Sequence, residues 1–366
     1  MIPYVAVSAV IFVSSLVVSA VLVPIVRRVS LRAGFVDHPA ERKVHRAPMP
    51  LGGGVAIFLG VLLPALAGVA VVLILHHGGV PAWLPAQLTD HIGGVLRVMP
   101  RLFLVMGGGL VLVVMGLLDD RRPIPAGLKL IVQLAVAFGL WLAGIRITVF
   151  VGSHAFSAVV TVLWITVVTN AFNFLDNMDG LSAGVAAISG AIFLAVAAAA
   201  GQFFVSASLL CLIGAVTGFL LYNFPPARIF MGDAGSTFIG YLLGVLTAML
   251  TFYTAGGGLF RVLAPVVILA LPLYDLTSVV LIRLSEGRSP FQPDKRHFSH
   301  RLAALGLSTR QVVLTIYLVT FSLGVSATFL FAVGPVGAVT VLVQVLAMIA
   351  VIWTLERAGG KRNGNA

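Results

Sequence analysis

Long apolar runs separated by short polar stretches fill most of this 366-residue chain. About 20 consecutive apolar residues are enough for a helix to cross a bilayer. The pattern therefore predicts an all-α polytopic membrane protein with about 11 transmembrane helices. The predicted spans are Ile2–Val26, Leu51–Leu75, Leu102–Leu118, Leu128–Gly144, Ala158–Thr169, Leu181–Ala200, Phe203–Tyr222, Thr237–Tyr253, Leu263–Ile282, Val312–Phe331 and Val336–Leu355. Residues 1–355 would form one integral membrane domain, and residues 356–366 a short cytoplasmic tail.

The basic residues divide unevenly between the two faces that alternating loops define. Of the 23 Lys and Arg residues, all but Arg97, Arg101, Arg146 and Arg261 fall on one face or in the tail. The positive-inside rule makes this face cytoplasmic, so we expect the N-terminus outside and the C-terminus inside. Only 10% of the residues are charged, against about a quarter in soluble domains. The net charge of +11 then reflects membrane topology, and we expect no nucleic-acid partner.

Acidic residues also gather at the predicted cytoplasmic ends of the spans. Ionisable groups close to hydrocarbon are costly, and they mark functional sites by default. The residues concerned are Asp119, Asp120, Asp176, Asp179, Asp233 and Asp275.

The densest polar segment is Asn170–Gly184, which continues an apolar run without a break. If the helix continues, the spacing of its three asparagines by three and four places them on one face. An ordinary helix cap would explain one polar residue but not five. We therefore predict a polar cassette that holds a charged ligand or a cation. Its members are Asn170, Asn173, Asp176, Asn177 and Asp179.

Two further loops carry carboxylates. Asp119 and Asp120 end the third predicted span, and Lys129 begins the next helix. Adjacent carboxylates repel, and burial disfavours their charged forms, unless a cation offsets both effects. Positive-inside flanking explains the neighbouring arginines but not a double aspartate.

The loop from Asn223 to Ser236 contains two prolines and two glycines. Irregular backbone next to a membrane is tolerated where it is buried or lines a cavity. Its Gly-Asp-Ala-Gly-Ser run precedes a helix and could bind phosphate through backbone N–H groups. Asp233 suggests a mediating divalent cation, because Mg²⁺ is held by one or two carboxylates together with substrate phosphates. A simple helix cap would account for Ser236 alone.

The last predicted cytoplasmic loop places His297 and His300 three residues apart, next to Arg301. Such a basic cluster suits a diphosphate, since arginine forms strong charge-assisted hydrogen bonds to phosphate. A loop that only touches anionic lipid is the alternative, and it explains the arginines better than the histidines. The first loop is basic and ends in Gly52–Gly54, where glycine allows another backbone or a headgroup to approach closely.

Together, these motifs resemble the polyprenyl-phosphate N-acetylhexosamine-1-phosphate transferases, the membrane family that includes MraY and WecA. The resemblance extends from about Asp37 to Gly306 and preserves the order of the motifs. It implies transfer of a sugar-1-phosphate from a UDP-N-acetylhexosamine to undecaprenyl or another polyprenyl phosphate, with release of UMP. It also implies Mg²⁺, with Mn²⁺ as an alternative, and a multi-pass enzyme of the bacterial cytoplasmic membrane whose site faces the cytoplasm. The family further suggests a homodimer.

The His-Phe-Ser-His-Arg-Leu run resembles the WecA/TagO branch, which uses small donors such as UDP-GlcNAc. Other members of that branch have a histidine where this chain has Ser299. Transfer of MurNAc-pentapeptide phosphate is the alternative within the family. The donor sugar, the polyprenyl length and the polymer pathway are not determined by these motifs.

The resemblance also implies roles for individual residues. The predicted catalytic residues are Asp119, Asp120, His297 and His300. The predicted metal ligands are Asp233 and Asn173. The predicted substrate-binding residues are Lys43, His45, Lys129, Asn170, Asp176, Asn177, Asp179, Asn223, Phe230 and Arg301, with Phe230 stacking on uracil.

Two other classes of protein compete with this interpretation. A secondary transporter of an anionic solute would place its site near the membrane midplane, on broken helices within repeats. The acids here crowd one face, and the sequence shows no clear repeat. A non-catalytic lipid-binding scaffold would need no metal. For the enzyme itself, direct transfer and a covalent aspartyl intermediate are both compatible with the sequence.

Overall fold

The computed structural model describes residues 2–38, 47–82, 84–148, 151–252, 258–291 and 297–363. Helices make up nearly all of its regular structure, as predicted. The helices are α1 (Ile2–Arg32), α2 (Gly53–Gly78), α3 (Ala86–Thr89), α4 (Ile92–Arg121), α5 (Ala126–Leu142), α6 (His154–Leu175), α7 (Leu181–Ala199), α8 (Phe203–Asn223), α9 (Gly232–Met249), the 3₁₀ helix η1 (Leu259–Leu263), α10 (Ala264–Ile268), α11 (Ala270–Ser285), α12 (Phe298–Ala303), α13 (Thr309–Phe329) and α14 (Pro335–Asn363). The two short strands, β1 (Val36–Asp37) and β2 (Met49–Pro50), pair in antiparallel fashion.

The number of helices that could span a membrane is lower than predicted. In the described part of the chain, eight helices are long and apolar enough, or nine if one bent pair counts as a single span. That pair is Leu259–Ile268 and Ala270–Ser285, which meet at an angle of 68°. The count of eleven is therefore not confirmed. Two predicted spans became shorter helices: α5 has 17 residues, and α9 has 18 and opens with a polar turn.

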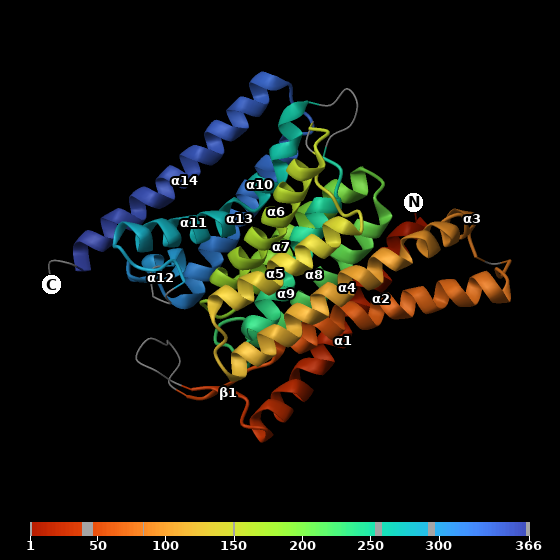
Figure 1. Cartoon of the computed structure of the whole chain (residues 1–366), viewed down its shortest axis with the longest axis horizontal. Helices are drawn as coiled ribbons and strands as arrows, with labels where there is room; N and C mark the ends of the chain where they lie inside the picture. The colour runs from red at the N-terminus through yellow and green to blue at the C-terminus, as the bar shows by residue number, and fades with distance from the viewer. Residues whose placement is uncertain are drawn as a thin grey trace.

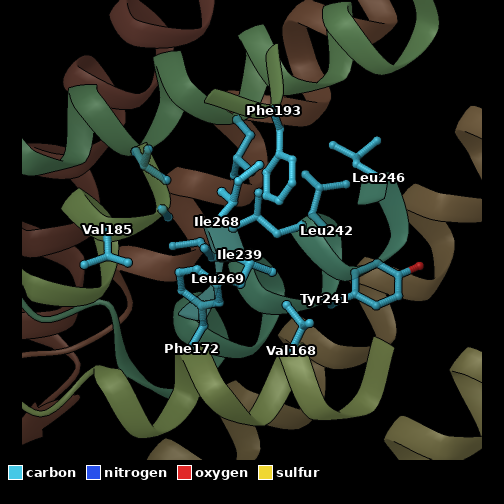
Figure 2. Packing of buried hydrophobic residues seen from close by; sticks show 14 of the residues in the cluster. Val168, Phe172, Val185, Phe193, Ile239, Tyr241, Leu242, Leu246, Ile268 and Leu269 are labelled. Atoms are coloured by element: carbon cyan, nitrogen blue, oxygen red, sulfur yellow. The ribbon is translucent and has the colours of Figure 1, made fainter. Parts of the chain in front are cut away.

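Helix α9 explains part of this difference, because it lies inside the bundle. Every residue from Ala234 to Ala248 is buried. A helix that is apolar on all sides is typical of a protein core as well as of a membrane span, and sequence alone does not separate the two. Figure 2 shows Ile239 and Leu242 of α9 packed close to Phe172 of α6 and Phe193 of α7. This surrounding core fixes the position of the first turn of α9, which carries Asp233.

Two glycines allow α2 and α4 to approach that first turn closely. A Cβ atom added to Gly116 of α4 would lie 2.3 Å from the amide nitrogen of Ala234, and one added to Gly54 of α2 would lie 2.2 Å from that of Gly235. The amide of Gly54 also donates to the carbonyl of Met231 over 3.0 Å. The glycine run after the first loop thus serves close backbone approach, as predicted.

The outermost helices present apolar side chains to their surroundings. Figure 1 shows α14 along one edge of the molecule and α1 and α2 along the opposite edge. On α1 and α14, Val10 and Leu346 are 67% and 65% exposed. Large exposed apolar surfaces are unusual for soluble monomers, and here they agree with helices that face lipid.

Candidate active site

Five ionisable side chains from four separate segments meet near the N-terminal end of α9, and we call them the carboxylate cluster. The Lys129 ammonium on α5 lies between two of its acids, with Nζ 2.7 Å from Asp119 Oδ2 and 3.0 Å from Asp233 Oδ2. The structure thereby brings together three of the predicted motifs. The members of the cluster are Asp119, Asp120, Lys129, Asp176 and Asp233.

The two adjacent aspartates of α4 make different contacts. Asp120 Oδ1 accepts a hydrogen bond from the backbone N–H of Asp233 over 2.8 Å. Because the first N–H groups of a helix lack partners within the helix, this carboxylate caps α9 from a neighbouring helix. Asp119 instead binds Lys129 and accepts from the N–H of Ile124 over 2.6 Å. The sequence could not distinguish these two roles.

Asp176 is the C-cap residue of α6, is half-buried, and lies close enough to the other acids to interact with them electrostatically. Burial, together with the negative charges of Asp233, Asp120 and Asp179, raises the pKa of Asp176 well above its usual value. The cluster contains one lysine and four carboxylates, so its negative charge is only partly neutralised. A bound cation would stabilise the charged forms of these carboxylates.

The donor set fits Mg²⁺ bound together with a phosphate ligand. Within the described residues, no group of three His, Cys, Asp or Glu side chains is arranged to hold a metal ion on its own. Mg²⁺ seldom uses such a cage, because it keeps several waters and binds one or two carboxylates plus substrate phosphates. Asp176 and Asp233 can supply carboxylate oxygens. Asn173 donates through Nδ2 to Ser236 Oγ over 3.0 Å, so its carbonyl oxygen is the atom suited to a cation.

Two other polar residues of the cassette connect it to neighbouring segments. Asn170 Nδ2 donates to Gln133 Oε1 on α5 over 2.6 Å, and Asp179 Oδ2 accepts from the N–H of Ala227 over 2.9 Å. The predicted common face of the three asparagines is wrong for Asn177, because α6 ends at Leu175. Residues 176–180 form a turn after the helix.

Asn223 is buried and uses both ends of its amide on the backbone. Its Oδ1 accepts from the N–H of Gly180, and its Nδ2 donates to the carbonyl of Ile229, each over 2.9 Å. Asn223 therefore shapes the site by holding the cassette against the proline-containing loop. Its direct contact with a nucleotide stays a prediction.

A second group of side chains, which we call the histidine site, forms where α12 begins. His297 Nδ1 lies 2.9 Å from Asp275 Oδ2, and the N–H of Phe298 donates to Asp275 Oδ1 over 2.6 Å. Ser299 Oγ donates to Asn177 Oδ1 in the cassette. The ring centroids of His297 and His300 are 6.3 Å apart. The histidine site consists of Asp275, His297, Ser299, His300 and Asn177.

For the remaining predicted residues, the structure gives contacts that do not bear on their predicted roles, or gives no description. Arg301 Nη2 donates to Ser278 Oγ on α11 over 2.9 Å. The N–H of Phe230 donates to the carbonyl of Pro50 over 2.9 Å, and stacking of its ring on a base stays a prediction. Lys43 and His45 lie outside the described residues.

Asp275 was predicted only as one of the six acids that mark a functional site, and Ser236 and Ser299 received no predicted role, yet each contacts a predicted residue. For Asp275 a signal existed, since a carboxylate inside the apolar run Leu263–Ile282 is costly without a partner.

Comparison with known proteins supports the resemblance in the motifs. Residues 102–251, which include both aspartates of α4 and Asp233, match the model of glycosyl transferase family 4. The chain is 34% identical to a probable undecaprenyl-phosphate N-acetylglucosaminyl 1-phosphate transferase of Bacillus subtilis strain 168, over 86% of this chain and 83% of that protein.

Two further relatives come from other bacteria. A decaprenyl-phosphate N-acetylglucosaminephosphotransferase of Mycolicibacterium smegmatis is 31% identical over 91% of this chain and 85% of its own length. An undecaprenyl-phosphate alpha-N-acetylglucosaminyl 1-phosphate transferase of Yersinia pestis is 30% identical over 86% and 80%, respectively. Identity at this level along most of each chain means that this chain belongs to glycosyl transferase family 4.

Proposed function

We propose that the protein transfers GlcNAc-1-phosphate from UDP-GlcNAc to undecaprenyl or another polyprenyl phosphate and releases UMP, as a first membrane step of cell-envelope polysaccharide synthesis. The observation that carries the proposal is the carboxylate cluster, in which acids from three separate segments meet one lysine. The names of the relatives support the transferred group, GlcNAc-1-phosphate, and the polyprenyl phosphate acceptor.

The reaction exchanges one phosphate bond for another. An oxygen of the lipid phosphate forms a bond to the β-phosphorus of UDP-GlcNAc, while the bond from that phosphorus to the bridging oxygen breaks. UMP leaves with the electron pair of the broken bond. Catalysis of such a transfer rests mainly on positioning and on neutralisation of charge.

Asp119 is suited to position Lys129 for the acceptor phosphate rather than to deprotonate that phosphate. A phosphate monoester has its second pKa near 6, so at neutral pH it is already largely a dianion. Asp119 is held by Lys129 on one oxygen and by the N–H of Ile124 on the other. Lys129 also contacts Asp233, and its positive charge favours the approach of phosphate to this acidic surface.

Asp233 and Asp176, with the carbonyl oxygen of Asn173, are the residues that would hold Mg²⁺. When bound, this ion neutralises negative charge on the diphosphate and on the departing UMP. Asp120 keeps Asp233 in position through the cap on α9. His297, His300 and Arg301 would meet the diphosphate or the sugar, because the bond between Ser299 and Asn177 joins α12 to the cassette.

The proposed site faces the cytoplasm of a bacterial inner membrane. This orientation is supported by the basic residues, which concentrate on the same predicted face as the carboxylate cluster. Assembly into a homodimer stays a prediction of the family resemblance.

The test is a UMP-release assay on purified protein in lipid, with undecaprenyl phosphate and a panel of UDP-sugars. We expect release with UDP-GlcNAc, loss of release in EDTA, and recovery when Mg²⁺ is restored. Asp233→Asn should lower the rate by about 10³-fold, because it removes one charge from the centre of the site. Asp90→Asn, at the C-cap of α3, is the matched control and should keep its activity.

Two results would contradict the proposal. Full activity in EDTA would show that the reaction needs no divalent ion. Uptake of an anionic solute into vesicles, without UMP release under any donor, would favour the transporter class.

A further inference from the structure

We propose that Asp275 is a positioning residue that fixes the tautomer and the orientation of His297 for its contact with substrate. The inference rests on the proposed transferase function. Asp275 was predicted only as one of six acids near span ends, and it lies outside the carboxylate cluster from which that function was argued. Its effect would pass through the His297 ring, since both carboxylate oxygens are already engaged by protein groups.

The first observation is the burial of a charge in an apolar helix. Asp275 lies in α11 and is 0% exposed. An isolated buried carboxylate is costly and is found only with partners. Asp275 has two, the imidazole of His297 and the N–H of Phe298, and both belong to the start of α12. Both hydrogen-bond partners of this carboxylate thus come from the last loop, although His297 lies 22 residues later in the chain.

The second observation is how the fold brings these groups together. The apolar segment that contains Asp275 is bent by 68° between α10 and α11. Figure 1 shows α11 and α12 close together beyond this bend. Ser278, one turn after Asp275, binds Arg301 of α12. One stretch of α11 therefore holds two residues of the predicted diphosphate contact.

The third observation is the chemistry of the imidazole. A neutral imidazole donates from one nitrogen and accepts at the other. An ionised carboxylate can only accept, so its pairing with a neutral His297 requires the ring proton on Nδ1 and leaves Nε2 as the nitrogen for a ligand. A carboxylate that orients a histidine in this way is a recurrent device in enzymes and metal sites.

The ring of His297 is held from other sides as well. It packs edge-on against Phe174 of α6, with ring centroids 5.7 Å apart. Its side chain is 10% exposed. The bond from Ser299 to the cassette fixes α12 two residues later. A side chain held at so many points has lost its rotational freedom before substrate arrives, which lowers the entropic cost of a productive contact.

A simple capping role for Asp275 makes a different prediction, and Asp275→Asn separates the two. The asparagine keeps an oxygen that can accept from the N–H of Phe298, so the start of α12 is preserved. Its amide N–H₂ faces His297 Nδ1, which must then accept, and the ring proton moves to Nε2. We expect kcat for UMP release to fall by about 10²-fold. Thr277→Ala, on an exposed position of the same helix, is the control and should remain active.

Two measurements identify the route of this effect. First, Asp275→Asn placed in a His297→Gln background should cost less than about two-fold, because residues that act as one unit are strongly non-additive. Second, solid-state ¹⁵N NMR of histidine-labelled protein in lipid, at alkaline pH, should show the Nδ1–H tautomer for His297 and its loss in Asp275→Asn. His297→Gln assigns the signal.

An equal cost of Asp275→Asn in both backgrounds would overturn the inference, and so would a His297 signal that does not respond to Asp275→Asn. The NMR measurement needs no turnover. A wild-type protein that shows the expected tautomer but releases no UMP would therefore contradict the proposed function and leave the Asp275–His297 pairing intact.

Discussion

The carboxylate cluster and the histidine site are built in different ways. The cluster is carried by α4, α5 and α9 and by the end of α6, and Asp233 lies in the first turn of the buried helix α9. The histidine site depends on α12, a helix of six residues. Such a short helix has little stability of its own, and side-chain bonds from Asp275 and Asn177 hold it in place.

This difference in construction implies that changes in the two regions should have different effects on stability and activity. The carboxylate cluster concentrates like charges, so a rigid core is needed to keep them close together against their repulsion. In the proposed function the histidine site contacts a substrate, and a few side-chain bonds hold it in place. Changes in the core of the cluster should therefore affect both stability and activity, whereas changes in the tethers of α12 should affect mainly activity.

Of three substitutions that test this comparison, Lys129→Met in the carboxylate cluster should have the largest effect on activity. It removes the ammonium between Asp119 and Asp233 and leaves their repulsion without compensation, so we expect UMP release to fall by about 10²-fold. Arg122→Met removes one positive charge from the same end of α4 and α5, at an exposed position, and should retain activity within about two-fold. Equal losses in the two variants would mean that Lys129 acts only through the general positive field of this face.

Gly116→Ala tests the close contact beneath the cluster. Its Cβ would lie 2.3 Å from the amide nitrogen of Ala234, so α4 and α9 must move apart, and we expect a loss of about 1–3 kcal/mol in stability. Gly107→Ala, on an exposed face of the same helix with no atom within 4 Å, should be neutral or up to about 1 kcal/mol more stable. Thermal unfolding in lipid or detergent measures both variants. A melting temperature for Gly116→Ala at or above that of Gly107→Ala would contradict the packing.

Ser299→Ala should have the smallest effect of the three and should spare stability. It removes the bond from α12 to Asn177, a loss of about 1 kcal/mol or about five-fold in rate. The expected result is a lower kcat/KM for UDP-GlcNAc with an unchanged melting temperature. Ser285→Ala, at the exposed end of α11, is the control. A clear fall in the melting temperature of Ser299→Ala would show that the tether supports the fold as a whole.

Much of the architecture could be predicted from the sequence because its signals are local. Apolar length predicted membrane helices, and most of the predicted spans coincide with helices able to cross a bilayer. The concentration of acids at one set of span ends predicted that Asp119, Asp233 and the cassette would meet, and the structure places Lys129 between the first two. The positions of single residues along one run were sufficient for these predictions.

Contacts between distant segments decided the rest. The burial of α9 depends on which helices surround it, and its composition fits a core as well as a membrane. The separate contacts of Asp119 and Asp120 depend on how the first turn of α9 lies against α4. The partnership of Asp275 with His297 depends on the bend before α11. The sequence thus determined that the helices lie in a membrane and which chemical groups the site contains, since hydropathy and charge are properties of each residue. Tertiary structure decided which groups touch, because a hydrogen bond requires two atoms to be about 3 Å apart, and only the packing of the helices sets that distance.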